Sequence, residues 1–209
     1  HKCLESIESQ TFKDFEVLCI DDGSTDNSAV IVNEYCNQDK RFRLIQCKKT
    51  NAGNARNVGL AEAVGKYVIF LDADDWFESD MIETAVKESE KHELEIFIWN
   101  VDENDNLTGE INSNTPHFRK ELLLEGKKVF SSEDQKYLFN FVSGAPWNKM
   151  YLKSFIINNS LSYSNSSSYN DLYFTYAALL SAKRIYCVEE VFTHYRVNNE
   201  NSLQGKREK

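Results

Sequence analysis

Apolar and polar positions follow two alternating periods along the first hundred residues. Short continuous apolar runs, typical of strands buried on both faces, are followed by stretches with the apolar spacing of amphipathic helices. The pattern predicts strands over 15–20, 42–45, 67–71 and 94–101 and helices over 26–35, 52–64 and 80–92. Strands that alternate with helices build a parallel sheet covered on both faces. We therefore expect an α/β fold with a mainly parallel sheet flanked by helices.

The pattern changes after residue 101. Residues 102–118 are polar and lack periodicity, which indicates a connection. Ser131 and Asp134 then have the spacing of a capping box and predict a helix through Phe141. A last helix is predicted over 171–182, with short strands over 185–188 and 191–195. We expect a single domain with two halves, residues 1–101 and 102–209.

Composition narrows the classes of protein. Lys and Arg number 24 against 33 Asp and Glu, a net charge of −9, which argues against a nucleic-acid partner. The longest apolar run, 67–71, is far shorter than the roughly 20 residues of a membrane-spanning helix. The 5 cysteines are widely spaced, which favours reduced thiols and a cytoplasmic location over a disulfide framework.

Carboxylates gather where two of the predicted strands end. Asp21 and Asp22 follow the first strand, and Asp72 and Asp74 follow the third. In an open α/β sheet, ligands bind at the carboxyl ends of the strands. One acidic cluster at such a place is often only turn and helix-cap chemistry, but two neighbouring clusters repel each other unless a cation lies there. Hard oxygen ligands of this kind suit Mg²⁺ or Mn²⁺.

A stretch of small residues lies between the two acidic clusters. Residues 51–59 (NAGNARNVG) open a helix, and their small side chains allow the backbone to approach a ligand closely. Arg56 adds a cation beside the acids. Two interpretations stay open here: contact with a bound nucleotide, or tight packing of the helix on the sheet with Arg56 in a salt bridge.

The motifs DDGSTD, NAGNARNVG and FLDADD, in this order, resemble those of the inverting family-two nucleotide-sugar glycosyltransferases, which have the A-type glycosyltransferase fold. Residues 146–149, 170–171 and 195–202 extend the resemblance over nearly the whole chain. The resemblance implies transfer of a sugar from a nucleoside-diphosphate donor, commonly UDP-linked. The acceptor would be a glycan or lipid-linked hydroxyl in bacterial surface polysaccharide synthesis, and a single displacement would invert the sugar.

The resemblance also implies a role for each candidate residue. Nucleotide binding falls to Asp21, Asp22, Arg56 and Asp72, the Mn²⁺ or Mg²⁺ ion to Asp74 with Asp72, the general base to Asp171, and contacts with acceptor or diphosphate to Trp147, His194 and Arg196. Ordinary roles stay open for several of them: a helix cap for Asp171, and packing for Trp147 and His194.

The residues next to the predicted base depart from the family or add to it. The family usually has Glu directly before the base, and Asn170 here removes that negative charge. Residues 160–169, rich in Ser and Asn, are expected to form an acceptor-side lid, with a solvated surface loop as the alternative.

The two ends of the chain carry further expectations. Residues 204–208 resemble the Q-x-x-R-W tail of processive synthases, but Glu208 replaces the tryptophan, which predicts a non-processive enzyme. The family resemblance implies transfer of a hexosyl or N-acetylhexosaminyl group. The basic residues Lys206, Arg207 and Lys209 suggest peripheral contact with the inner face of the membrane. Family members begin with an apolar strand that this chain lacks. We expect about 15 to 30 preceding residues in the natural protein, whose strand lies between 15–20 and 67–71.

Two other functions compete with sugar transfer. The segment VIFLDADD imitates the nucleophile motif of haloacid-dehalogenase-type phosphatases, although that family carries it on its first strand. A catalytically silent module that binds a nucleotide sugar is the second alternative.

Overall fold

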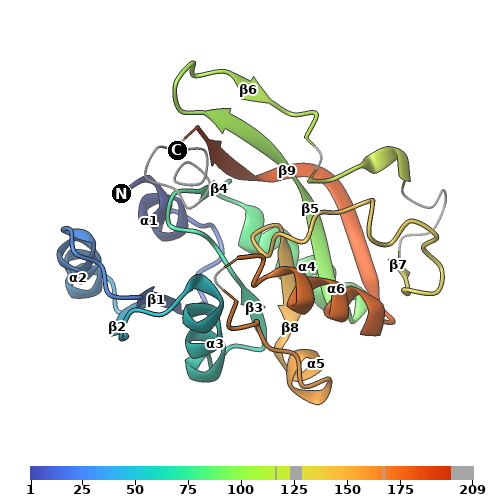
Figure 1. Ribbon diagram of the computed structural model, residues 1–209. Coiled ribbons are helices and arrows are strands. Elements are labelled where there is room, and N and C mark those ends of the chain that lie inside the picture. Colours follow the sequence, from blue (N-terminus) through green and yellow to red (C-terminus); the bar gives the residue numbers. More distant parts are fainter. Residues whose placement is uncertain (116, 123–128, 167, 199–209) are drawn as a thin grey trace.

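The computed structural model describes residues 1–115, 117–122, 129–166 and 168–198 (Figure 1). The elements in chain order are α1 (Lys2–Glu8), β1 (Val17–Asp21), α2 (Ser28–Gln38), β2 (Phe42–Gln46), α3 (Ala52–Glu62), β3 (Tyr67–Ile69), β4 (Trp76–Phe77), α4 (Met81–His92), β5 (Ile96–Asp105), β6 (Ile111–Asn112), the 3₁₀ helix η1 (Lys120–Leu122), β7 (Val129–Phe130), β8 (Lys149–Leu152), α5 (Lys153–Asn158), α6 (Leu172–Ser181) and β9 (Ile185–Val197). No helix in the described part of the chain is long and apolar enough to cross a membrane.

The strands form two sheets. β1 and β2 pair in parallel as a sheet of their own. The larger sheet has the order β3-β8-β5-β9-β4, with β6 paired to β5 and β7 to β9. Its long β5–β9 ladder is parallel, whereas β3–β8, β5–β8 and β4–β9 are antiparallel. The α/β class with flanking helices is confirmed, and the sheet is mixed rather than mainly parallel.

The core lies on both faces of β5. Ile96 and Ile98 point into a cluster with residues of α5 and α6, and Phe97 and Trp99 point into a second cluster with residues of α4. All four side chains are completely buried. A strand covered on both faces needs apolar residues at successive positions, which explains the continuous run seen in the sequence.

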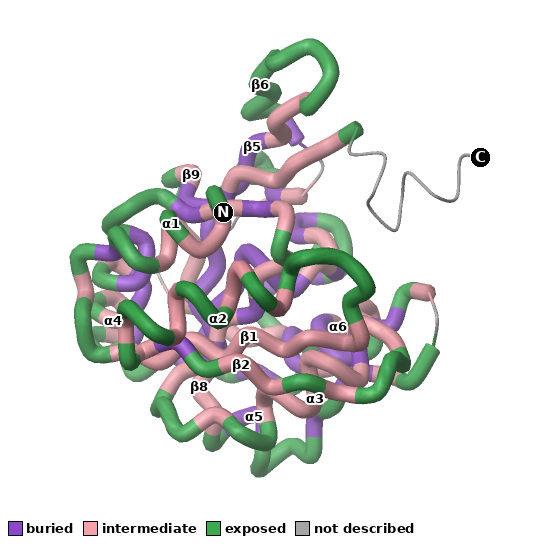
Figure 2. Tube along the Cα trace, turned by 90° about the vertical axis from the view of Figure 1, so that its left-hand side faces the viewer, coloured by how far each residue is buried: buried purple, intermediate pink, exposed green. Residues whose placement is uncertain are grey.

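β1 differs from the buried strand that the sequence predicts. All five of its residues are half-buried, and Figure 2 shows β1 and β2 mostly in the intermediate colour. Among the described strands, β1 pairs only with β2, and β3 pairs only with β8. β1 and β3 are therefore not paired with each other. A further strand between them stays a prediction.

The predicted helix from Ser131 to Phe141 is wrong. The N–H and the hydroxyl of Ser131 both donate to Asp134 Oδ2 at 3.0 Å, as in a capping box, but the residues that follow form turns. Gln135 accounts for the difference, because its side chain accepts from the Tyr137 N–H and donates to the Leu122 carbonyl. These bonds replace helical ones.

One long strand, β9, takes the place of the two short strands predicted near the end. It runs through residues 189 and 190 without a break. Its register against β5 shifts around Asn100, whose side chain donates to the Glu189 carbonyl at 3.3 Å. A bulge in the ladder therefore absorbs the irregularity that the sequence pattern suggests is a turn.

Candidate functional site

Arg56 connects two of the predicted motifs. From α3, its Nη2 donates to Asp72 Oδ1 at 2.6 Å, and its Nη1 donates to Asn170 Oδ1 at 3.2 Å. Its side chain is 14% exposed. Burial alone lowers the pKa of Arg56, but the charge and hydrogen bond of Asp72, with the interactions of Tyr163 and Asp171, outweigh burial and raise it. Arg56 therefore has the salt bridge that the sequence left open, and it links the end of β3 to the residue before Asp171.

Asp171 lies at the start of α6 as its N-cap residue, and its side chain makes no capping hydrogen bond. Its backbone carbonyl accepts from the Thr175 N–H at 3.0 Å. The residue is half-buried, and its negative charge acts on both Arg56 and Tyr151. Side-chain capping therefore does not explain an aspartate here. The role of general base stays a prediction.

Asp74 and Asp75 are tied to β9 by Arg196. The Arg196 Nε donates to the Asp74 carbonyl at 3.0 Å, and the Arg196 N–H donates to Asp75 Oδ1 at 2.8 Å. Asp75 is completely buried, and its Oδ2 has no hydrogen-bond partner among the described residues. Burial raises the pKa of Asp75 to about 8, and the charges of Asp72 and Asp74 add to the rise. Arg196 thus holds the backbone of the acidic motif in place.

The two predicted metal ligands, Asp72 and Asp74, are half-buried. In the described ranges, no group of three or more His, Cys, Asp or Glu side chains could hold a metal ion. Mg²⁺ and Mn²⁺ commonly take one or two carboxylates and complete their shell with water and substrate phosphates. The oxygen donors present fit a cation of that kind and do not fit an all-protein metal cage.

Trp76 on β4 is surrounded by positively charged side chains. The Lys2 Nζ lies 3.3 Å from the ring centroid, and the guanidinium of Arg196 lies 5.3 Å from it. The ring of His194 stacks on Trp76 at 5.3 Å with an angle of 22°. Cations over an indole face are attracted by its quadrupole. Trp76 therefore packs against protein groups and brings β9 to the residues after β3.

His194 is held between two carboxylates. Its Nδ1 lies 2.8 Å from Asp102 Oδ1, and its Nε2 lies 2.8 Å from Glu78 Oε1. Burial alone lowers the pKa of His194, but the bonds and charges of Asp102 and Glu78 outweigh burial and raise it. Both ring nitrogens are thus occupied by the protein, as expected for a structural histidine. Sequence reasoning missed Asp102, Glu78 and Lys2, because they reach this place only through tertiary structure: Asp102 pairs opposite His194 in the β5–β9 ladder, Glu78 follows β4, and Lys2 comes from α1.

Trp147, the other predicted contact on the acceptor side, is 4% exposed. Its ring stacks on Tyr195 at 5.1 Å with an angle of 17° and meets His117 edge-on at 5.0 Å. Its carbonyl accepts from the Thr193 hydroxyl. The geometry favours the packing role for Trp147.

Asp21 and Asp22 shape the turn after β1. Asp21 Oδ1 accepts from the Ser24 N–H at 2.8 Å, and hydrogen bonds from Ser24 lower the pKa of Asp21. Asp22 Oδ1 accepts from the N–H and hydroxyl of Thr50 at 2.8 and 3.0 Å. Gly23 between them has a φ of +77°, which suits glycine. The turn chemistry is therefore present at this cluster, and contact with a nucleoside stays a prediction.

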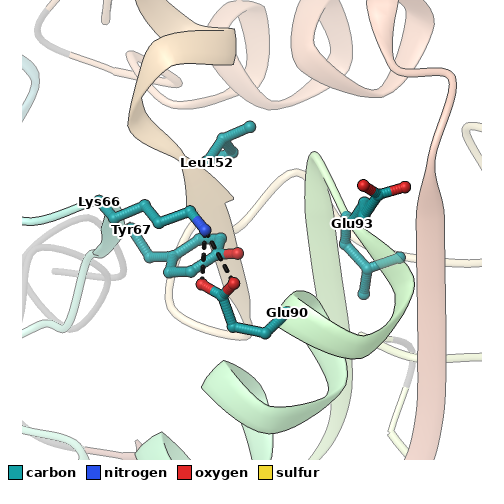
Figure 3. Close-up of a pocket in the computed structure, with 6 residues that line it drawn as sticks. Lys66, Tyr67, Glu90, Glu93 and Leu152 are labelled. Carbon is teal, nitrogen blue, oxygen red and sulfur yellow. Dashed lines mark hydrogen bonds and ion pairs between the residues drawn. The ribbon is translucent and has the colours of Figure 1, made fainter.

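A pocket of about 260 Å³ lies away from these residues (Figure 3). It is lined by Lys66, Tyr67, Glu90, Glu93, Leu94 and Leu152. The Lys66 Nζ pairs with Glu90 at 2.6 Å on its wall. Since Tyr67 begins β3 and Asp72 follows its end, the pocket is at the opposite end of that strand from the acidic motif.

The model of the family described as glycosyl transferase family 2 matches residues 1–158, three quarters of the chain and all three motifs. The chain belongs to glycosyltransferase family 2. This membership accounts for the FLDADD segment, so the phosphatase alternative loses its support.

Relatives and solved structures agree with this family. EpsH of Bacillus subtilis (strain 168), named as a glycosyltransferase, is 29% identical over 99% of this chain and 59% of its own length. The uncharacterized glycosyltransferase YibD of Escherichia coli (strain K12) is 30% identical over 94% of this chain and 57% of its own. A crystal structure of S. aureus TarS with UDP-GlcNAc shares the fold, with a TM-score of 0.78 at 22% identity, covering 94% of this chain and 54% of that one. The chain thus spans less than two thirds of these proteins.

Proposed function

We propose that this chain transfers a sugar from a nucleoside-diphosphate donor, UDP-linked, to a hydroxyl of a glycan or lipid-linked acceptor. One observation carries the proposal: Arg56 bonds both Asp72 and Asn170, so one guanidinium joins the acidic motif to the residue before the predicted base Asp171. A donor held at the motif would therefore present its sugar toward the carboxylate of Asp171. The solved TarS complexes with UDP and UDP-GlcNAc support a uridine donor.

The proposed step is a single displacement. Asp171 accepts the proton of the acceptor hydroxyl while that oxygen forms a bond to the anomeric carbon. The bond from the anomeric carbon to the diphosphate oxygen breaks, its electron pair stays on the diphosphate, and the sugar is inverted. Asp74 with Asp72 would hold Mn²⁺ or Mg²⁺, which supplies charge neutralisation for the diphosphate. The solved structure of GalNAc-T7 with UDP, GalNAc and Mn²⁺ supports such an ion.

The proposal extends to the sugar transferred, the processivity of the enzyme, its pathway and its location. We propose hexosyl or N-acetylhexosaminyl transfer, one residue per encounter, in bacterial surface polysaccharide synthesis at the cytoplasmic face of the membrane. Residues 1–101 would bind the donor and 102–209 the acceptor. The tail residues on which non-processivity and membrane contact rest, within 199–209, lie outside the described residues.

A nucleotide screen tests this function. UDP with Mn²⁺ is expected to raise the melting temperature more than GDP, CDP or dTDP, and UDP-sugars are expected to release UDP over time. Binding without any release of UDP would favour the silent nucleotide-sugar-binding module. No stabilisation by any nucleoside diphosphate would contradict both functions.

Asp74→Asn is expected to abolish the stabilisation that Mn²⁺ adds to UDP binding. The amide keeps the shape of the side chain but removes the charge that the cation needs, and the bond from Arg196 goes to the backbone carbonyl, which the substitution keeps. Thermal shift with UDP and Mn²⁺ measures the effect. Asp80→Asn, at an exposed helix start, is the control and should behave as the wild type. An Asp74→Asn protein with an unchanged Mn²⁺ effect would contradict the metal assignment.

Asn170→Asp is expected to shift the acid side of the activity profile to higher pH. The carboxylate keeps an acceptor for Arg56 Nη1, and it places a second negative charge beside Asp171, which makes the deprotonated base less favourable. UDP release from UDP-GlcNAc, measured across pH in both proteins, checks the shift. A profile that does not move would argue against Asp171 as the titrating base.

A further inference from the structure

Helix α3 is fastened to the segment that precedes Asp171. Asn57 makes two bonds to one residue: its Oδ1 accepts from the Tyr163 N–H, and its Nδ2 donates to the Tyr163 carbonyl, both at 2.9 Å. Six residues earlier, at the N-cap of α3, Asn51 Nδ2 donates to Asn165 Oδ1 at 2.8 Å. Asn57 thus satisfies both backbone polar groups of Tyr163, as a neighbouring strand would.

The backbone of α3 also touches this segment, at Gly53. A Cβ atom at Gly53 would clash with the Ser164 carbonyl oxygen and lie 2.9 Å from the Asn170 Cβ. Ser164 and Asn170 are themselves joined, since the Ser164 N–H donates to the Asn170 carbonyl at 3.1 Å. Gly53 and Asn57 are four positions apart and so share one face of the helix. That face receives both ends of the segment that leads to Asp171.

Tyr163 connects this attachment to α6. Its ring stacks on Phe174 at 4.1 Å with an angle of 12°, and both residues are buried. Phe174 lies in the first turn of α6, the helix that Asp171 opens. Asn57 therefore holds the backbone of a residue whose ring packs against the turn that carries the predicted base.

We propose that Asn57 is a positioning residue for Asp171, acting through Tyr163. This inference rests on the proposed function. The two Asn57 side-chain bonds go to Tyr163 and not to the acidic motif, so its loss is expected to move the base and leave donor binding unchanged. A misplacement of about 1 Å in a reacting group lowers the rate by about 100-fold.

Asn57→Ala tests the proposal, with Asn159→Ala as the matched control. Asn159 also donates from its side chain to a backbone carbonyl, that of Phe155 at 2.9 Å, but on α5 and away from the segment. Three measurements are made on each protein: amide hydrogen exchange at Tyr163 and Ser164, UDP affinity with Mn²⁺ by calorimetry, and the kcat for UDP release from UDP-GlcNAc. We expect the Asn57 variant to lose protection at Tyr163 and to fall about 10- to 100-fold in kcat. Its UDP affinity should equal that of the wild type, and the control should change in none of the three.

Several outcomes would overturn the proposal. Wild-type kcat, or wild-type protection at Tyr163, in Asn57→Ala would do so, and an equal loss of UDP affinity would indicate a general structural role. If Asn57→Ala does not fold, Asn57→Asp replaces it: it loses the donor to the Tyr163 carbonyl and keeps the acceptor for the Tyr163 N–H, so kcat and UDP affinity, and not protection at Tyr163, make the comparison. If the wild type releases no UDP from any UDP-sugar of the nucleotide screen, the proposed function fails, and hydrogen exchange alone decides whether Asn57 holds the segment.

Discussion

Asp171→Asn is expected to lower sugar transfer by about 10²- to 10⁴-fold, the usual cost of removing a general base. The amide has nearly the same shape as the carboxylate but cannot take the proton of the acceptor hydroxyl. Since the Asp171 side chain makes no capping bond, the substitution should cost little stability. UDP release from UDP-GlcNAc with Mn²⁺ measures the rate, and calorimetry with UDP should show unchanged binding.

The matched control for this variant is Asp80→Asn. Asp80 is also the N-cap of a helix, α4, and also makes no side-chain capping bond. Any loss that comes from altering an uncapped helix start would appear in both proteins. A fall confined to Asp171→Asn supports the base, whereas an Asp171→Asn enzyme with the wild-type rate would refute it.

Lys149→Met is expected to destabilise the fold by about 2–4 kcal/mol. Lys149 is completely buried, and its Nζ donates to the Ser143 and Ala145 carbonyls at 3.0 and 2.7 Å and to Asn148 Oδ1 at 2.7 Å. Methionine fills similar space without a donor, so three acceptors lose their partner. Denaturant unfolding measures the change, and Lys87→Met, at an exposed position on α4, is the control. A Lys149→Met protein as stable as the wild type would contradict the role of these bonds.

The same lysine should produce a pH signature. Burial lowers the pKa of Lys149 from 10.5 to about 7. Above pH 7 the unfolded chain therefore binds more protons than the folded one, so the free energy of unfolding gains a term that rises with pH. The difference in stability between wild type and Lys149→Met is expected to grow from about pH 7 to about pH 8.5. The comparison stops at about pH 8.5, because burial raises the pKa of the Cys187 thiol, and at higher pH this thiol lowers the free energy of unfolding.

The sequence predicts those helices and strands whose own residues carry a clear apolar pattern. α4 and β5 lie close to their predicted ranges, because a stripe or run of apolar residues is buried there. α3 also lies close to its predicted range, although Gly53 is its single buried residue. The turns after Ser131 could not be predicted, since they depend on the Gln135 bond to Leu122 across the fold. The half-burial of β1 likewise depends on which strands lie beside it.

In the candidate site too, features that depend on local sequence could be predicted, and contacts between distant residues could not. The positions of Asp72 and Asp171 at element ends follow from local pattern and motif order, and Arg56 was expected beside the acids. Its bond to Asn170 was not expected, because it joins residues far apart in the chain. The same holds for His194 with Asp102, which meet because β5 and β9 pair in one register.

The position of β9 beside the central strand β5 has a consequence for biosynthesis. β5 lies between β8 and β9, so the second ladder of β5 closes only when residues 185–197 are available. While the chain is being made, the edge of β5 that pairs with β9 stays unpaired through some eighty residues of further translation. A nascent chain that is stalled on the ribosome before Ile185 should therefore bind chaperones and be digested by proteases. The arrest-length profile of protease resistance should rise sharply once β9 has left the exit tunnel.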